Sequence, residues 1–367
     1  MKLESSLKDL EPKPGSTAAA VGHAPELAAI EAAARRLEAG ELVAFPTETV
    51  YGLGADAENP AAVAAIYQAK GRPSNHPVIV HLAPGADAAY WSDQISPMAQ
   101  QLMTAFWPGP LTLILPRALH IPDAVSGGQA SIGLRCPSHP VAQALLRSFK
   151  AGRGGIAAPS ANRFGHVSPT TAQHVREEFR DSNLVQCVLD GGQSEVGIES
   201  TIIDLTRGAP VLLRPGHVSA AQLAEVLGVW PAQPDAAAPR ASGTLEAHYA
   251  PQAAVALVGT ARLSSTLAAL LQANRQVALL HFSSVPTFGG QPVAAALAAR
   301  AELPLMAAGF AHDLYAALRG LDRTGIELIV VEAPPVSPDW HAVNDRLKRA
   351  AHDSTAVLAT LIGAAGH

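Results

Sequence analysis

Residues whose types could do chemistry gather in short segments between positions 45 and 216. The first runs Phe45-Pro-Thr-Glu-Thr-Val-Tyr-Gly-Leu-Gly54, so that two threonines, a tyrosine and two glycines follow a predicted strand. Ligands of α/β proteins bind at such strand ends, where hydroxyl groups and backbone amides can hold a small polar molecule. Thr47 and Thr49 are therefore candidate ligand-binding residues.

The second segment, Lys70-Gly-Arg-Pro-Ser-Asn-His-Pro77, places two cations after a predicted helix. Lys70 and Arg72 flank one glycine, so both can reach a single anion. An arginine offers a planar fork and a lysine a point charge, a pairing that suits a polyphosphate. The alternative is a solvated turn with two surface cations. No Gly-Lys-Ser/Thr follows a glycine-rich run, so the chain has no P-loop.

Two further predicted strands end in arginine, at Arg135 and Arg214. A buried arginine needs an anionic partner, which for Arg135 is either a carboxylate of the protein or a carboxylate of a ligand. Together with Lys70 and Arg72 these residues put four cations beside hydroxyl groups, at strand or helix ends. That set suits a ligand that carries both phosphates and a carboxylate.

Small residues surround Ser160 and Asn162, which alternate along Ala157-Ala-Pro-Ser-Ala-Asn162 and can face one ligand. Ser160 lacks the Gly-x-Ser-x-Gly setting of a nucleophile, so we expect no covalent catalysis. Ser168-Pro-Thr-Thr171 also fits the start of a helix. The chain has 14 histidines but no His-Glu-x-x-His motif and no His/Cys cluster, so we expect no transition-metal site.

The composition limits the class of protein. A chain of 367 residues predicts two domains, and its 48% hydrophobic and 16% charged residues exclude a disordered chain. Apolar runs reach about eight residues where a membrane span needs about 20, and the first residues lack a secretory signal. Two cysteines exclude a disulfide scaffold, and a net charge of −5 argues against a broad basic face while leaving room for a local basic cleft. We expect a cytoplasmic protein.

Short apolar segments and amphipathic segments alternate in the first part of the chain, which predicts an α/β or α+β domain ending near Gly228. We expect strands at 42–45, 78–82, 111–115, 131–135, 155–158, 185–189, 200–205 and 211–214, and helices at 24–39, 60–69, 96–106, 139–149 and 170–179.

Residues 230–243 contain proline and alanine without an apolar period, and so read as a linker. Regular strand–helix alternation beyond it predicts a smaller, Rossmann-like parallel α/β domain, without a Gly-x-Gly-x-x-Gly dinucleotide site. Its expected strands are 255–258, 277–282 and 326–332, and its expected helices are 263–273, one near 291–301, 307–319 and 339–350. The predicted organisation is a flexible leader (1–22), a first domain (23–228), a linker or lid (229–252) and a second domain (253–367).

Six ordered motifs resemble the YrdC-like threonylcarbamoyl-AMP synthases over about residues 25–220, and residues 242–251 with the second domain resemble the long, two-domain form of that family. The motifs are FPTETVYGLGADA, KGRPSNHPVIVH, IGLRCPSHP, AAPSANRFGHVSPT, GIESTIIDL and LLRPG. The fold that the resemblance implies is an open, twisted α/β sheet with a concave and locally basic face.

The resemblance implies a nucleotidyltransferase that converts L-threonine, bicarbonate (or CO2) and ATP, with Mg²⁺, into threonylcarbamoyl-AMP and pyrophosphate. A partner transferase then modifies the adenosine next to the tRNA anticodon, so a weak contact with tRNA is expected and a membrane partner is not. The reaction needs no protein nucleophile, and Lys70 and Arg72 position the phosphates. We expect no side-chain ligand for the metal.

The resemblance also assigns binding roles. For ATP it implies Lys70, Arg72, His76, Ser131, Ser160, Asn162, Ser168, Arg214 and Tyr249, with His248 closing over the nucleotide beside Tyr249. For threonine it implies Thr47, Thr49, His81, Arg135 and Ser200, with Arg135 on the carboxylate. The chain departs from the family at His76, where asparagine is common, and in the linker at 242–247.

Two other functions are considered. A non-catalytic RNA-binding module could use the same concave basic face. The net acidity and the aromatic content of 5% argue against base-stacking platforms. A carbamoyl-transferring relative is disfavoured because the chain has no Cys-x-x-Cys.

Overall fold

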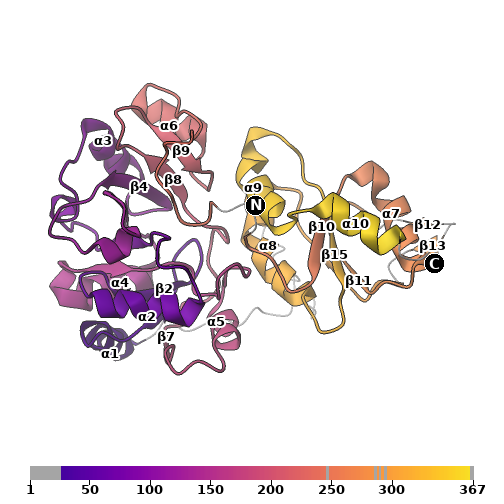
Figure 1. The fold of residues 1–367 in the computed structure, drawn as a ribbon, viewed down its shortest axis with the longest axis horizontal. Coiled ribbons are helices and arrows are strands. Elements are labelled where there is room, and N and C mark those ends of the chain that lie inside the picture. Colours follow the sequence, from indigo (N-terminus) through magenta and orange to yellow (C-terminus); the bar gives the residue numbers. More distant parts are fainter. Residues whose placement is uncertain (1–25, 245–247, 285–286, 289–290, 293–295, 364–367) are drawn as a thin grey trace, which may run out of the picture.

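The structure is a computed structural model that describes residues 26–244, 248–284, 287–288, 291–292 and 296–363. Two α/β units follow one another along the chain and lie side by side, the indigo-to-pink unit at the left and the orange-to-yellow unit at the right of Figure 1. A mixed sheet forms the centre of the first unit and a parallel sheet the centre of the second. The α/β fold class is confirmed.

The sheet of the first unit has nine strands in the order β7-β1-β2-β6-β3-β5-β4-β8-β9. The strands are β1 (Val43–Phe45), β2 (Gly52–Asp56), β3 (Ile79–Leu82), β4 (Leu111–Pro116), β5 (Ser131–Arg135), β6 (Gly155–Ala157), β7 (Cys187–Val188), β8 (Thr201–Asp204) and β9 (Val211–Arg214). Because β3 and β5 pair in parallel, with His81 opposite Arg135, two predicted site residues meet at one end of the sheet.

Helices cover both faces of this sheet. They are α1 (Leu27–Glu38), α2 (Pro60–Lys70), α3 (Pro97–Phe106), α4 (Pro140–Ser148), α5 (Ala172–Glu178) and α6 (Ala220–Leu227), with 3₁₀ turns η1 (Ala88–Tyr90), η2 (Asp123–Ser126) and η3 (Phe149–Gly152). The residues of β1 alternate between two apolar cores: Phe45 packs in the core that holds α1 and α4, and Ala44 in the core that holds α2 and α3.

Helix α2 illustrates how local sequence places a site residue. Asn59 caps its N-terminus by accepting hydrogen bonds from two backbone N–H groups, and a proline occupies its first position. Gly71 ends it in the left-handed conformation, with φ of 63°. Lys70 is therefore the last residue of α2, and the chain changes direction at Gly71 before it reaches Arg72.

The sheet of the second unit has four parallel strands in the order β10-β15-β11-β14, which confirms the predicted parallel sheet. The strands are β10 (Ala254–Val258), β11 (Val277–His281), β14 (Ala299–Glu302) and β15 (Leu328–Glu332), and a separate ribbon joins β12 (Thr287–Phe288) to β13 (Gln291–Pro292). The helices are α7 (Thr260–Gln272), α8 (Ala307–Leu321), α9 (His341–Ala350) and α10 (Ser354–Gly363), with the 3₁₀ turn η5 (Pro338–Trp340). Helices α8 and α9 face the first unit (Figure 1).

The helix predicted near 291–301 is wrong. Gln291–Pro292 and Ala299–Glu302 are strands, and residues 293–295 lie outside the described residues. The alanine-rich sequence favours a helix locally, but β14 pairs with β11 along four residues at the edge of the sheet, and this pairing overrides the propensity. Strand β2 and helices α6 and α10 lie where no element was expected.

Within the described part of the chain, no helix is both long and apolar enough to cross a membrane.

Candidate active site

Nine of the predicted site residues, together with His248, line one buried cavity of about 40 Å³, between the strand ends of the first unit and the linker residues Ser242, His248 and Tyr249. The nine are Thr47, Thr49, Arg72, His81, Arg135, Ser160, Ser200, Arg214 and Tyr249. A water molecule needs roughly 10–15 Å³ of such space, so the cavity as it stands accommodates a few waters.

Arg135 meets a carboxylate of the protein, Glu48. Arg135 Nη2 donates to Glu48 Oε1 at 2.6 Å, and the side chains are 4% and 3% exposed. The other Glu48 oxygen accepts the Ser138 backbone N–H at 3.1 Å, and Arg135 Nε donates to the Gly109 carbonyl at 3.3 Å. Among the described residues Arg135 Nη1 has no hydrogen-bond partner, so this end of the guanidinium is available at the cavity wall.

The two threonine hydroxyls bind each other, with 2.8 Å between their oxygens. Thr47 Oγ1 donates its proton to the Val50 carbonyl at 2.6 Å. A hydroxyl has one proton to donate, so Thr49 is the donor in the threonine pair. Because no other described residue donates to Thr49 Oγ1, its lone pairs can accept from a donor on a ligand, such as an amine.

His81 lies on β3 beside Arg135 and is buried, with Nδ1 unpartnered among the described residues. Its ring makes an edge contact with Phe45, with 6.0 Å between ring centres. Burial and then the charge of Arg135 lower the pKa of His81 to about 3. The ring is therefore neutral at physiological pH.

Arg72 and Arg214 also line the cavity and are buried, and every hydrogen bond they make within the described structure goes to a neutral oxygen. Arg214 donates to the Ser200 carbonyl at 2.9 and 3.0 Å and to the Ser242 carbonyl at 2.7 Å. Arg72 donates to the Pro77 carbonyl at 3.0 Å and to Ser242 Oγ at 3.4 Å. Burial lowers the pKa of Arg72 to about 10, with a contribution from the nearby charge of Arg214. Two buried cations with no hydrogen bond or ion pair to a carboxylate of the described residues mark a site for an anion.

Lys70 does not line the cavity. Its buried Nζ donates to the Ser160 carbonyl at 2.6 Å and to the Asn162 carbonyl. Burial lowers its pKa well below the ordinary range of a lysine. In this structure Lys70 ties α2 to the loop that carries Ser160 and Asn162, and its role toward phosphate stays a prediction.

Four other residues predicted to bind ATP also lie outside the cavity lining. Asn162 Nδ2 donates to the carbonyls of Arg163 and His166, and its buried Oδ1 has no partner among the described residues. His76 packs its ring against that of Phe164, Ser131 begins β5, and Ser168 Oγ donates to a Glu199 oxygen at 2.6 Å. Their contacts with ATP stay predictions.

Tyr249 closes the cavity from the linker. It is fully buried with a left-handed backbone (φ 62°), stacks on Tyr315 of α8 at 5.7 Å, and donates to the Gly243 carbonyl at 3.4 Å. The adjacent His248 ring lies 4.1 Å from it. Part of the linker departure from the family pattern, residues 245–247, lies outside the described residues.

Two buried carboxylates of the site received no role from the sequence, although both stand inside motifs that were singled out. Glu48 binds Arg135, and Glu199 binds Tyr315 and Arg346 of the second unit at 3.0 and 2.8 Å. Both Glu48 and Glu199 are thus committed to arginines. Arg346 stands in no motif, so sequence reasoning had no signal for it.

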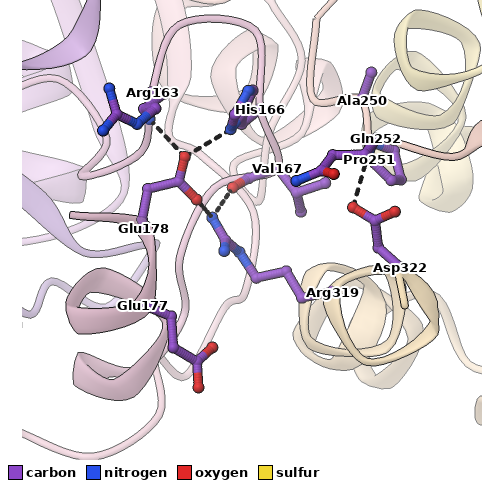
Figure 2. Close-up of a pocket in the computed structure, with 10 residues that line it drawn as sticks. All are labelled: Arg163, His166, Val167, Glu177, Glu178, Ala250, Pro251, Gln252, Arg319 and Asp322. Atoms are coloured by element: carbon purple, nitrogen blue, oxygen red, sulfur yellow. Dashed lines mark hydrogen bonds and ion pairs between the residues drawn. The ribbon is translucent and has the colours of Figure 1, made fainter. Parts of the chain in front are cut away.

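A second cavity, of about 300 Å³, lies between the units, and none of the predicted site residues lines it (Figure 2). Glu178 on α5 accepts hydrogen bonds there from Arg163 N at 2.9 Å, His166 Nδ1 at 2.7 Å and Arg319 Nη2 of α8 at 2.9 Å. Burial raises the pKa of Glu178, but the bond from His166 and the charge of Arg319 outweigh it and lower that pKa to about 2. The ion pair with Arg319 fastens α8 to α5, and the bonds from Arg163 and His166 hold the loop that follows Asn162 to the same carboxylate.

No group of three or more His, Cys, Asp or Glu residues in the described ranges could hold a metal ion.

Comparison with known proteins covers both units. Residues 35–216 match the Sua5/YciO/YrdC family model, described as "Telomere recombination", and residues 218–352 match "Threonylcarbamoyl-AMP synthase, C-terminal domain". The threonylcarbamoyl-AMP synthase of Pyrococcus abyssi is 37% identical over 88% of this chain and 93% of its own length, and that of Bacillus subtilis is 39% identical over 88% and 92%.

A solved structure supports the same family. The crystal structure of P. abyssi Sua5 complexed with L-threonine superposes with a TM-score of 0.81, at 35% identity, over 90% of this chain and 96% of that one. Fold and matches define the class: proteins that join a YrdC-type domain to a Sua5 C-terminal domain. The chain belongs to the Sua5 family of threonylcarbamoyl-AMP synthases, in its long, two-domain form.

Proposed function

We propose that this chain is a threonylcarbamoyl-AMP synthase, which forms L-threonylcarbamoyladenylate and pyrophosphate from L-threonine, bicarbonate and ATP. The observation that carries the proposal is a single buried cavity in which, among the described residues, one Arg135 nitrogen has no partner, the Thr49 hydroxyl oxygen accepts no bond and two cations make no bond to a carboxylate. The chain is 37% and 39% identical to two relatives named as synthases, over more than nine-tenths of their length. This similarity supports the synthase function over the RNA-binding alternative.

The reaction needs positioning and charge neutralisation more than covalent help from the protein. The threonine amine combines with bicarbonate to give a carbamate, and water is released. A carbamate oxygen then attacks the α-phosphorus of ATP, and the bond to the β-phosphate oxygen breaks to release pyrophosphate. The enzyme is accordingly a nucleotidyltransferase.

The threonine end of the cavity fits this chemistry. Arg135 Nη1 would bind the threonine carboxylate, because Nη2 is already held by Glu48. Thr49, whose lone pairs are free, would accept from the amine, and Thr47 fixes Thr49 in place. His81 and Ser200 would complete the threonine pocket.

The phosphate end is the pair Arg72 and Arg214. ATP carries about four negative charges near neutral pH, which these cations and a Mg²⁺ ion bound to the phosphates would offset. Since Glu48 and Glu199 are engaged by arginines, phosphate oxygens and water are the expected metal ligands. The remaining proposed ATP contacts are Lys70, His76, Ser131, Ser160, Asn162, Ser168 and Tyr249.

Ser242 occupies the place proposed for phosphate. It contacts both Arg72 and Arg214, and the cavity of about 40 Å³ is too small for a nucleotide. We therefore propose that the linker withdraws to admit ATP, whose oxygens replace those of Ser242, and then closes His248 and Tyr249 over it.

The product is an activated carbamoyl donor, and we propose that a transferase in the cytoplasm consumes it to modify the tRNA adenosine next to the anticodon. A weak contact of this chain with tRNA belongs to the same proposal.

Pyrophosphate release by purified protein with ATP and Mg²⁺ tests the function, with threonine and bicarbonate omitted one at a time and serine as a substitute for threonine. Release that requires both supports the synthase, and Arg135→Ala should abolish it. Absence of release in folded protein would refute the proposal and favour RNA binding. Release without threonine would indicate a different adenylating reaction.

A further inference from the structure

A carboxylate lies in the wall of the cavity that is proposed to receive ATP. Glu199 precedes Ser200 and lines the cavity with Arg214 and Tyr249. Its side chain is 8% exposed. An unbalanced negative charge at this position would repel the phosphates and offset much of the attraction of the nearby arginines.

The second unit supplies the balancing charge. Arg346 on α9 has a fully buried side chain, and its Nε donates to Glu199 Oε2 at 2.8 Å. Tyr315 on α8 donates to the same oxygen at 3.0 Å, and Ser168 Oγ donates to the other oxygen at 2.6 Å. Although burial raises the pKa of the Glu199 carboxyl, the charges of Arg346 and Arg214 outweigh this and lower it to about 2. Glu199 is therefore ionised and needs its partner at neutral pH.

The guanidinium of Arg346 also supports the lid. Its centre lies 5.4 Å from the ring centre of Tyr249, which stacks on Tyr315. Its Nη1 donates to Asp345 at 2.6 Å, which fixes the orientation of the guanidinium on α9. One buried arginine of the second unit thus contacts both a wall residue and a lid residue of the cavity in the first unit.

We propose that Arg346 is a positioning residue of the synthase reaction: supplied by the second unit, it cancels the charge of Glu199, so that ATP phosphates meet Arg72 and Arg214 without opposition, and it seats Tyr249 over the nucleotide. This inference rests on the proposed function. It gives the second unit a definite part in ATP binding.

Substitution of Arg346 by an uncharged residue of similar length tests the charge balance. In Arg346→Met we expect the Kd for a non-hydrolysable ATP analogue and the KM for ATP to rise at least about tenfold, as expected when a buried charge loses its partner. The KM for threonine should change less than about twofold, because Arg346 acts at the phosphate end. Lys348→Met, an exposed position on the same helix, is the matched control and should change neither value.

The decisive variant is Glu199→Gln combined with Arg346→Met. Removing the uncompensated charge should restore most of the lost ATP affinity, and Arg346→Lys should retain part of it. A purely structural Arg346 predicts the opposite pattern: lower thermal stability and kcat, an unchanged KM for ATP, and no rescue by Glu199→Gln. Either an unchanged ATP affinity in folded Arg346→Met or the absence of rescue would overturn the proposal.

If Arg346→Met fails to fold, Tyr315→Phe keeps the test decisive, because it removes one donor to Glu199 with little change of volume. A smaller weakening of ATP binding, reversed by Glu199→Gln, is then expected, and unchanged binding would refute the inference. Binding of the ATP analogue needs no turnover. A wild type that binds ATP but releases no threonine-dependent pyrophosphate therefore refutes the proposed function while the Arg346–Glu199 measurements still decide this inference.

Discussion

Arg135 and Glu48 form a buried ion pair, 2.6 Å long, that joins the end of β5 to the loop after β1. Among the described residues, this pair and the bond from Nε to the Gly109 carbonyl leave only Nη1 of the guanidinium for the cavity. Since a freely rotating arginine could present any of its nitrogens, Glu48 limits how a threonine carboxylate can be bound there. Two separate sequence motifs thus supply the binding residue and the residue that orients it.

Glu48→Gln should lower the free energy of unfolding by about 3–5 kcal/mol, the usual result of leaving one member of a buried ion pair without its partner. It should also raise the KM for threonine more than the KM for ATP. Denaturant unfolding and steady-state kinetics measure both effects. Glu41→Gln is the control, because its ion pair with Arg36 is about half exposed and should contribute at most about 1 kcal/mol. Equal effects of the two substitutions would contradict the assigned role.

Gly243→Ala should displace the linker from its contacts with Tyr249 and Arg214. Gly243 has φ of +73°, and a Cβ there would lie 2.0 Å from the Tyr249 hydroxyl and 2.9 Å from Arg214 Nη1. We expect a loss of about 1 kcal/mol from the backbone conformation and a larger loss from the clash. Gly228→Ala measures the backbone contribution without the clash. Gly228 also has a positive φ (+69°), but no atom of the described residues lies within 4 Å of its added Cβ. Thermal unfolding of both variants should show the larger decrease in Gly243→Ala, and equal decreases would argue against the docked linker.

Acid should destabilise the protein through His81. Its pKa is about 3 in the folded protein and 6.5 ordinarily, so the folded state binds fewer protons than the unfolded state between these values. The stabilising contribution is complete above about pH 6.5 and is lost as the pH falls toward 3, by roughly 1.4 kcal/mol per pH unit. His81→Gln should reduce the slope of unfolding free energy against pH between 4 and 6. An unaltered slope in His81→Gln would show that His81 is not buried and neutral.

Lys70→Met should cost stability as well as activity. The carbonyls of Ser160 and Asn162 lose their donor, which costs about 1–3 kcal/mol per buried unsatisfied group, partly offset because a buried ammonium is removed. Unfolding in denaturant and binding of an ATP analogue should both weaken. Unchanged stability with weakened ATP binding would instead indicate that Lys70 turns to the phosphates in solution.

Most elements of the first unit could be read from apolar runs, caps and breakers. The predicted helix at 60–69 is α2, with its cap at Asn59 and its stop at Gly71. Strand β2 escaped detection because Gly52-Leu-Gly-Ala-Asp56 has little side-chain pattern, and its strand conformation comes from pairing with β1 and β6. The helix prediction for the alanine-rich segment around Ala299 failed for the same reason, since pairing with the neighbouring β11 determines its conformation. The domain boundaries and the individual ligand contacts stay predictions.

By itself the sequence determined the family, the α/β class of both units and nine residues that share one cavity. These features could be predicted because motifs at strand ends are short local patterns that can be recognised along the chain. Tertiary structure decided which partner each charge has. Arg135 faces Glu48, Lys70 faces two carbonyls, and Glu199 reaches Arg346, 147 positions further along. Such pairings depend on the distance between side chains in the folded chain and on their removal from water. Neither the distance nor the burial can be read from the order of the residues.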